Sequence, residues 1–314
     1  MLEEFLSTNQ YYFEKDINLS SKTWLKTGGK VSYWIQPNSI NQLVNIIVYL
    51  KKNNHEFELV GQTTNIYFRP KNNYFIIISA IKVNKVNILN DLIECECGAL
   101  VSSISRKAVN LGFQGFYGLV NLPGSIGAAV INNSSCFNCS VSALMLKVEV
   151  LCLETLKISE LFYNDFKYIH HSSQYKGNKK IVVLRVFLKC DKGIAQIERE
   201  KAKKVTIERR LTQEPGAYTL GSVCSQLILR NNIKNFLARG LVKINFLFGN
   251  KDLTFKRLLL IFYQYNDLDD FISDKTINTF IWKKDCLDLD VKYLRYKEFL
   301  RKVFKVVYFE IEEK

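Results

Sequence analysis

Glycine is unusually dense in residues 112–133, GFQGFYGLVNLPGSIGAAVINN, where it recurs at positions 112, 115, 118, 124 and 127 around Pro123. Glycine inside a regular element costs roughly 0.5–1 kcal/mol relative to alanine, so this density marks backbone that turns sharply or approaches something closely. The turn at Pro123-Gly124 and the small residues after it would expose N–H groups to a flat or anionic ligand. The pattern favours a cofactor loop. A glycine-rich turn between buried strands is the alternative.

A second polar loop, Gly61-Gln62-Thr63-Thr64-Asn65, follows the strand-like run FELV. The hydroxyls of Thr63 and Thr64 could donate to a phosphate. β-Branched residues nevertheless resist the positive φ that a tight phosphate-binding turn requires. An ordinary polar turn is the alternative at this position.

An adjacent pair, His170-His171, accounts for two of the three histidines in the chain. An imidazole changes charge near neutral pH, so the pair could serve a function, and a surface-loop pair without one is the alternative. Ser222 follows Gly221, which on its own is typical of a capping or turn serine. Glu310 and Glu312 alternate, so they share one face of a strand, and a solvated acidic tail is the alternative there.

The elements that must position these residues begin with a βαβ-type unit. The chain turns after Gly28-Gly29 into a strand within residues 18–37. Apolar positions 40, 43, 46, 47 and 50 then predict a helix capped by Asn38 or Ser39. Residues 57–68 predict a strand, a turn and a strand.

Strand-like runs and a helix within residues 74–110 lead to the glycine-rich segment. Further strands are expected at 143–162, two or more amphipathic helices at 228–267, and a helix followed by a strand at the end of the chain. Residues 1–16 carry no motif, and we expect them to form a loose arm.

The chain of 314 residues is 47% hydrophobic and has a net charge of +14, with a pI near 9.3. The excess of cations favours anionic partners, but it forms no stripe with interleaved aromatic residues, which argues against nucleic acid. The N-terminus lacks an apolar signal core, and no run approaches the ~18–20 apolar residues that span a bilayer. We therefore expect a cytoplasmic protein without a membrane partner.

Eight cysteines are scattered over the chain. The pairs Cys95-x-Cys97 and Cys136-x-x-Cys139 could in principle combine into a four-thiolate metal site, but C-x-C spacing is atypical of zinc. Buried free thiols in a reducing compartment are the favoured interpretation, and no metal is expected.

Residues 112–133 resemble the central motif of the UDP-N-acetylenolpyruvoylglucosamine reductase family, often called MurB, which wraps a flavin. The residues that match this motif are Gly112, Gly115, Pro123, Gly124, Gly127, Ala129, Val130 and Asn133. Tyr117 and Asn121 depart from it, and residues 134–138, SSCFN, replace a typical A-G-A-Y-G. The loop at Gly61 resembles the G-G-G-S-N loop of the family, with Gln62 and Thr63 replacing glycines.

Three further segments resemble the same family. Residues 208–227 carry its R-R-x-x-Q-P and G-S-V pattern, on Arg209, Arg210, Gln213, Pro215, Gly221, Ser222 and Val223. Residues 166–177 resemble F-x-Y-R-x-S-x-F-K, with His171 in place of the arginine that binds the substrate carboxylate. Residues 272–275, ISDK, and the C-terminal glutamates resemble its final motifs, although Leu268-Asp269 replaces a Gly-Gly pair.

The resemblance implies an α+β protein with the three-domain FAD-binding fold of the family, which has PCMH-like FAD-binding domains and a C-terminal substrate domain. The expected boundaries are 17–78, 79–200 and 201–314. The implied catalytic residues are Ser222, Glu312 (with Glu310 as the fallback) and His171. The implied FAD-binding residues are Gly61, Thr63, Thr64, Asn65, Pro123, Gly124, Ser125, Gly127, Ala129 and Asn133. The implied substrate-binding residues are Ser173, Tyr175, Lys176, Arg210 and Gln213.

The implied reaction is NADPH-dependent, FAD-mediated reduction of UDP-N-acetylglucosamine enolpyruvate to UDP-N-acetylmuramate. It belongs to peptidoglycan synthesis, and thus to cell-wall biogenesis, cell shape and cell division. The expected enzyme is a monomeric flavoprotein oxidoreductase acting on a small UDP-sugar. The principal alternative is a degenerate homologue that keeps the fold and serves as a non-catalytic binding protein. Another flavin oxidoreductase of the same fold is a further alternative, against which the retained Ser222 argues.

Overall fold

The computed structural model describes residues 1–214, 219–247, 254–283, 286 and 288–314. Pro215, a motif residue in the sequence, lies outside these ranges. The chain forms two compact units. The first consists of Met1–Thr23, Gly28–Thr64 and Pro70–Arg209, and the second of Trp24–Thr27, Asn65–Arg69 and Arg210–Lys314. The three boundaries expected from the sequence remain predictions.

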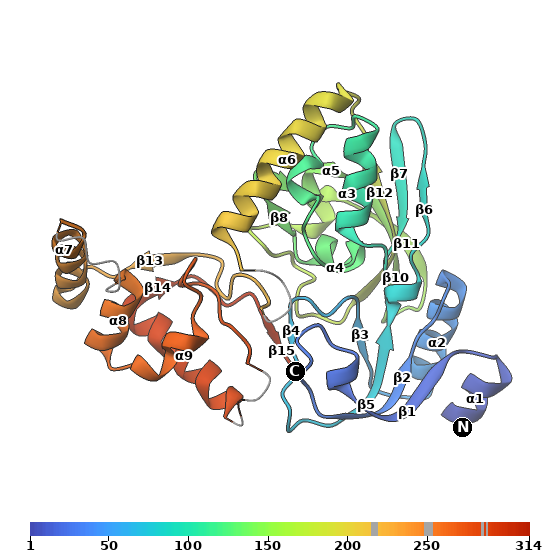
Figure 1. Ribbon diagram of the computed structural model, residues 1–314. Coiled ribbons are helices and arrows are strands. Elements are labelled where there is room, and N and C mark those ends of the chain that lie inside the picture. The colour runs from blue at the N-terminus through green and yellow to red at the C-terminus, as the bar shows by residue number, and fades with distance from the viewer. Residues whose placement is uncertain (215–218, 248–253, 284–285, 287) are drawn as a thin grey trace. The chain divides into compact units, whose positions relative to one another are not determined.

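A four-stranded sheet begins the first unit, with strand order β1-β2-β5-β3. Its strands are β1 (Phe13–Asn18), β2 (Lys30–Ile35), β3 (Glu58–Val60) and β5 (Tyr74–Ser79), and β2 and β3 both run parallel to β5. The crossover helix α2 (Ile40–Lys52) buries the predicted apolar face against this sheet. Ser39 Oγ caps α2 by accepting from Gln42 N at 3.3 Å. The predicted βαβ unit is confirmed (Figure 1).

The expectation of a loose N-terminal arm is wrong. Residues 2–8 form helix α1 (Leu2–Thr8), and β1 then pairs with β2 as an antiparallel edge strand. Leu2 and Leu6 are buried one helical turn apart, and the ring of Phe5 stacks on Tyr49 of α2 with centroids 3.8 Å apart. The segment is ordered because its short apolar stripe covers α2.

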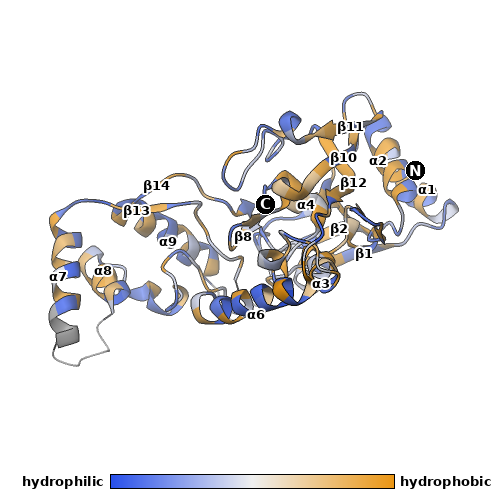
Figure 2. Cartoon of the chain, turned by 90° about the horizontal axis from the view of Figure 1, so that it is seen from above, coloured by the Kyte–Doolittle hydropathy of each residue, from blue (hydrophilic) through white to orange (hydrophobic). Residues whose placement is uncertain are grey.

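The second sheet of the first unit is five-stranded and antiparallel, with strand order β11-β10-β12-β7-β6. Its strands are β6 (Val86–Ile88), β7 (Leu92–Glu96), β10 (Met145–Cys152), β11 (Ile158–Phe162) and β12 (Ile181–Lys189). Helices α3 (Val101–Asn110), α4 (Ile126–Ile131), α5 (Val141–Leu144) and α6 (Ala195–Thr212) complete the layer, with the hairpin β8 (Ser135–Cys136) and β9 (Cys139–Ser140). Strands β10 and β12 are hydrophobic, whereas α6 carries long hydrophilic stretches (Figure 2).

The second unit is built on helices α7 (Ile233–Leu247), α8 (Phe255–Tyr263) and α9 (Leu289–Val303). Strands β13 (Leu227–Leu229) and β14 (Phe304–Val306) pair antiparallel, and β4 (Ile66–Tyr67) pairs in parallel with β15 (Glu312–Glu313). The core is aromatic and includes Tyr67, Phe280, Trp282, Tyr293, Tyr296 and Phe299. The helices predicted within 228–267 are confirmed as α7 and α8.

Short 3₁₀ turns connect these elements at η1 (Leu19–Ser21), η2 (Ala80–Lys82), η3 (Tyr117–Leu119), η4 (Tyr163–Phe166) and η6 (Asn266–Phe271). The mixture of helices and sheets confirms the predicted α+β class. Among the helices that the structure describes, none has both the length and the hydrophobicity needed to cross a bilayer.

Candidate active site

The glycine-rich turn and the Gly61 loop contact one another inside the first unit. Gly124 has a φ of 112°, which other residues adopt only at a cost, so glycine is required at this turn. Its N–H donates to Gln62 Oε1 at 2.8 Å. A Cβ added to Gly61 would lie 2.0 Å from Ser125 Oγ, so the two loops pack without room for a side chain at position 61. The structure thus brings together the two segments in which a cofactor site was predicted.

The first N–H groups of α4 bind protein acceptors. Ile126 N donates to Ala99 O at 2.8 Å, and Gly127 N donates to Cys97 O at 2.9 Å. A Cβ on Gly127 would come within 2.9 Å of Cys97 Cβ, so close packing against the residue after β7 accounts for this glycine. The cofactor roles of Gly127 and of the buried Ala129 remain predictions.

The Gly61 loop bends at Thr63, which is buried and adopts a φ of 59°. This left-handed conformation is unusual for a β-branched residue, whose Cβ substituents crowd the backbone there. The chain therefore forms a sharp turn at the position where the related motif has glycine.

Buried acceptors at the end of α4 indicate a place for a hydrogen-bond donor. The Oδ1 atoms of Asn132 and Asn133 are buried without a hydrogen-bond partner in the described structure, while Asn133 Nδ2 donates to Ile169 O at 2.8 Å. Such acceptors are costly unless a ligand or water supplies a donor. FAD offers an N–H group on its ring and anionic phosphates, so the glycine turn and these amides fit it. The side chain of Gln62 would have to leave Gly124 N before a phosphate could use that N–H group.

The predicted substrate segment, residues 166–177, is held against the end of α4. Ser173 is buried and donates through Oγ to Ile131 O at 2.6 Å, which makes it a structural anchor of the loop. The ring of Tyr175 packs edge-on against Phe166. Lys176 Nζ donates to His171 O at 3.2 Å, so a cation lies beside the position of the family arginine.

His171 is half-buried, with a φ of 52°, and its Nε2 lies 3.3 Å from Ser135 Oγ. Burial, reinforced by the nearby charges of His170 and Lys176, lowers the pKa of His171 to about 4. The imidazole is therefore neutral at neutral pH, so it can exchange hydrogen bonds but cannot supply the fixed charge of an arginine.

Ser222 is exposed in the second unit, and the buried residues after it bond to two neighbouring segments. On one side it forms a bridge with Thr279, and Val223 N donates to Asn278 O at 2.8 Å. On the other side Glu310 N donates to Val223 O at 2.9 Å. Asn278 adds side-chain bonds to both Cys224 N and Cys224 O. Asn278 therefore fixes the backbone beside Ser222.

The C-terminal glutamates lie beside the last residue of the Gly61 loop, again within the second unit. Asn65 Nδ2 donates to Glu310 O at 3.0 Å, and Glu312 N donates to Asn65 O at 3.0 Å. Ile311 is buried between these partly exposed glutamates. The structure thus joins Asn65, Val223 and Glu310 to Glu312, and it leaves the side chains of both glutamates partly exposed.

Sequence reasoning missed Glu313. Its carboxylate pairs with Arg69 Nη2 at 2.7 Å and with Lys297. Burial would raise the pKa of Glu313, but hydrogen bonds from Lys297 and Arg69 lower it below its usual value. No local pattern signals a contact between positions so far apart in sequence.

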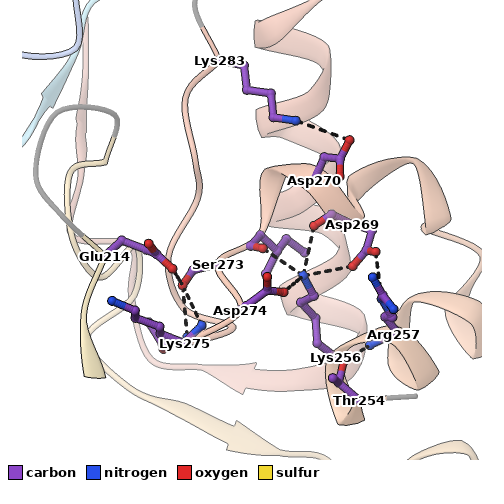
Figure 3. Close-up of polar contacts among 12 residues, drawn as sticks. Glu214, Thr254, Lys256, Arg257, Asp269, Asp270, Ser273, Asp274, Lys275 and Lys283 are labelled. Atoms are coloured by element: carbon purple, nitrogen blue, oxygen red, sulfur yellow. Dashed lines mark hydrogen bonds and ion pairs between the residues drawn. The ribbon is translucent and has the colours of Figure 1, made fainter. Parts of the chain in front are cut away.

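The ISDK motif holds the end of α6, where the predicted residue Arg210 lies, and Gln213 just after that helix. Lys275 Nζ donates to Arg210 O at 2.8 Å and to Gln213 O at 3.0 Å. Ser273 Oγ donates to Glu214 Oε1 at 2.7 Å (Figure 3). The bonds from Lys275 to the main-chain carbonyls of Arg210 and Gln213 therefore hold these two residues in place. The side chain of Arg210 is exposed.

Asp269, which replaces a glycine of the related motif, forms ion pairs with two cationic side chains. Lys256 Nζ lies 2.9 Å from Asp269 Oδ1, and Arg257 Nε donates to Oδ2 at 3.1 Å (Figure 3). Lys256 also donates to Asp274 Oδ1 at 2.6 Å. Burial would raise the pKa of Asp269, but the hydrogen bond and charge of Lys256 lower it. These contacts explain how the chain accommodates a carboxylate here.

The four-thiolate metal site considered from the sequence is not formed. Within the described ranges, no three His, Cys, Asp or Glu residues are grouped to hold a metal ion. Cys95 and Cys97 are buried free thiols, as the favoured interpretation predicted, whereas Cys136, Cys152 and Cys286 are only partly buried.

Comparison with known proteins decides the family. A family model described as an FAD binding domain matches residues 31–155. The UDP-N-acetylenolpyruvoylglucosamine reductase of Caldicellulosiruptor bescii is 31% identical over 224 residues, which cover 70% of this chain and 70% of that protein. The chain belongs to the UDP-N-acetylenolpyruvoylglucosamine reductase family.

Two other members of the UDP-N-acetylenolpyruvoylglucosamine reductase family are also similar to this chain. The reductase of Prochlorococcus marinus subsp. pastoris is 26% identical over 251 residues, covering 76% of this chain and 83% of that protein. The crystal structure of MurB from Thermus caldophilus superposes with a TM-score of 0.67 at 15% identity, over 96% of this chain and 99% of that chain. The predicted α+β FAD-binding fold is thereby confirmed, with this chain as a divergent member of the family.

Proposed function

We propose that the chain is a monomeric, cytoplasmic enzyme that reduces UDP-N-acetylglucosamine enolpyruvate to UDP-N-acetylmuramate with NADPH and FAD. Family membership supports the reaction class. The observation that carries the proposal is the segment at Ser222, which is hydrogen-bonded to Asn278 on one side and to Glu310 on the other. A hydroxyl is a weak acid, so a proton donor requires the fixed placement that these main-chain bonds give to Ser222.

The groups that would hold FAD are the Gly61 loop and the Pro123-Gly124 turn, with Thr63, Thr64 and Ser125 as hydroxyl donors. Asn133 Oδ1 supplies an acceptor, and Asn65 lies at the end of the same loop. When bound, FAD supplies the hydride that reduces the enolpyruvyl double bond. Gly127, which has no side chain, and Ala129, which has a small one, allow α4 to pack closely.

The remaining chemistry belongs to side chains of this chain. Ser222 Oγ donates the proton to C2, and Glu312, with Glu310 beside it, stabilises the enolic form by proton exchange. His171 is neutral and donates one N–H bond, so the positive charge for the substrate carboxylate comes from Lys176. Ser173 and Tyr175 shape the loop, while Arg210 and Gln213 bind other anionic and polar groups of the UDP-sugar.

A binding protein without catalysis is the second candidate. It is favoured by the neutral His171 and by Gln62, whose side chain occupies Gly124 N–H. In that case the fold would still recognise a nucleotide, but the enolic intermediate would lack its electrostatic partner.

The test is to load the purified chain with FAD, reduce it with NADPH and record the flavin absorbance when the enolpyruvyl sugar nucleotide is added. Reoxidation by that substrate, with formation of UDP-N-acetylmuramate, is the expected result. A chain that binds FAD but is not reoxidised would support the second candidate, and one that takes up no FAD would exclude the flavoenzyme.

A matched pair of variants tests the proton donor. Ser222→Ala should lower kcat by roughly 10²–10⁴-fold, the usual contribution of a positioned acid, while still allowing reduction of FAD by NADPH. Ser225→Ala, three residues along the same segment, should keep the wild-type turnover. Equal activity of the two variants would remove Ser222 from the mechanism.

A further inference from the structure

The hairpin of β8 and β9 places Cys136 directly opposite Cys139 in an antiparallel pair. The connecting residues Phe137 and Asn138 have φ values of 48° and 60°, the double left-handed conformation of a type I′ turn. Residues facing each other in such a pair have Cα atoms about 4.5–5.5 Å apart, and disulfides span about 4.4–6.8 Å. The backbone is therefore already at the separation that a disulfide requires.

The two thiols lie in different environments. Cys136 is partly exposed, and Arg209 Nη1 donates to its Sγ at 3.6 Å, which favours a thiolate. Cys139 is buried, and burial raises its pKa. A partly exposed thiol beside a cation is suited to attack a disulfide, and a buried thiol opposite it is suited to resolve the mixed disulfide.

Close packing holds the hairpin against the glycine-rich segment. A Cβ on Gly118 would lie 2.4 Å from Cys136 O and 2.9 Å from Cys139 Sγ. The hairpin therefore has little freedom to separate its two strands, which keeps both sulfurs within reach of one another.

We propose that Cys136 and Cys139 form a reactive dithiol that closes to an intramolecular disulfide by exchange with a low-molecular-weight disulfide. The Cys136 thiolate attacks one sulfur of the small disulfide, forming a mixed disulfide and releasing one thiolate. Cys139 then loses its proton to solvent and attacks Cys136 Sγ, releasing the second thiol. The protein loses two electrons and two protons, and the small disulfide takes them up as two thiols.

The chain provides an internal control for the experiment. Trypsin releases residues 108–147, which contain only these two cysteines, and residues 86–106, which contain Cys95 and Cys97. Cys95 and Cys97 are buried, and burial raises the pKa of each to about 12, so the fold should protect them. The folded chain is treated with glutathione disulfide, alkylated with iodoacetamide in denaturant, digested and analysed by mass spectrometry.

The expected product is a 108–147 peptide that escapes alkylation and weighs two hydrogen atoms less than the dithiol, while the 86–106 peptide is doubly alkylated. Cys139→Ser should accumulate glutathione on Cys136, and Cys136→Ser should leave Cys139 unmodified. Arg209→Gln should slow the exchange severalfold, because it removes the guanidinium that donates to Cys136 Sγ. These readouts need neither flavin nor substrate, so the outcome is independent of the proposed enzyme activity.

Two results would overturn the proposal. One is a 108–147 peptide that is doubly alkylated, like 86–106, after treatment of the folded wild-type chain. The other is a stable glutathione adduct on wild-type Cys136 without closure. Treating the chain in denaturant shows whether any difference between the two peptides comes from the fold.

Discussion

The charge of His171 decides what this residue can contribute. Because burial lowers its pKa to about 4, the unfolded chain binds a proton at higher pH than the folded chain does. The contribution of His171 to stability is therefore complete above its ordinary pKa near 6.5, and it is lost as the pH falls towards 4. The chain has three histidines, so an NMR titration of their imidazoles should give one resonance with a midpoint near 4. That resonance should vanish in His171→Gln, and the absence of any midpoint near 4 would contradict the assignment.

Gln62 determines whether the glycine turn can bind an anion. Its Oε1 accepts the Gly124 N–H, which a phosphate would otherwise use. A hydrogen bond contributes about 0.5–1.5 kcal/mol net, so Gln62→Gly should tighten FAD binding roughly two- to tenfold in a fluorescence titration. Gln62→Ala separates the two effects of glycine, since it removes the amide without adding backbone freedom. Weaker FAD binding by both variants would mean that Gln62 itself contacts the cofactor.

The segment from Asp269 to Lys275 depends on the cations of α8. Asp269→Asn should reduce stability by about 1–2 kcal/mol, because the mostly buried Lys256 loses a charged acceptor. Asp270→Asn is the matched control. Asp270 is 81% exposed and pairs only with exposed Lys283 at 3.3 Å among the described contacts, so its loss should change stability by less than about 0.5 kcal/mol. Urea denaturation compares the two, and equal midpoints would contradict the structural role.

Helix α1 is short, yet it should contribute measurably to the stability of the first unit. Leu6 is fully buried, so Leu6→Ala should cost about 2–5 kcal/mol in the free energy of unfolding. Leu89→Ala should cost less than about 0.5 kcal/mol, because Leu89 is 53% exposed. A loose N-terminal arm would instead give both variants the stability of the wild type.

Local sequence patterns predicted individual helices and turns better than they predicted which distant segments pair. The 3.6-residue period and the cap at Ser39 were sufficient for α2, and the glycine spacing was sufficient for the turn at Gly124. The pairing of β4 with β15 joins residues more than 240 positions apart, as in Arg69 with Glu313, and no local period encodes that contact. The neutral state of His171 was equally inaccessible, since it follows from burial rather than from residue type.

Each unit encloses its own hydrophobic cluster, and the chain enters the second unit at Trp24–Thr27 and Asn65–Arg69 before it continues there from Arg210. Separate cores are expected to unfold as separate cooperative transitions, so scanning calorimetry should show two. Leu6→Ala should lower the transition of the first unit, and Phe299→Ala, at a fully buried ring of the second, should lower the other. One transition that moves with both variants would show instead that the two cores unfold cooperatively, so that loss of either destabilises the whole chain.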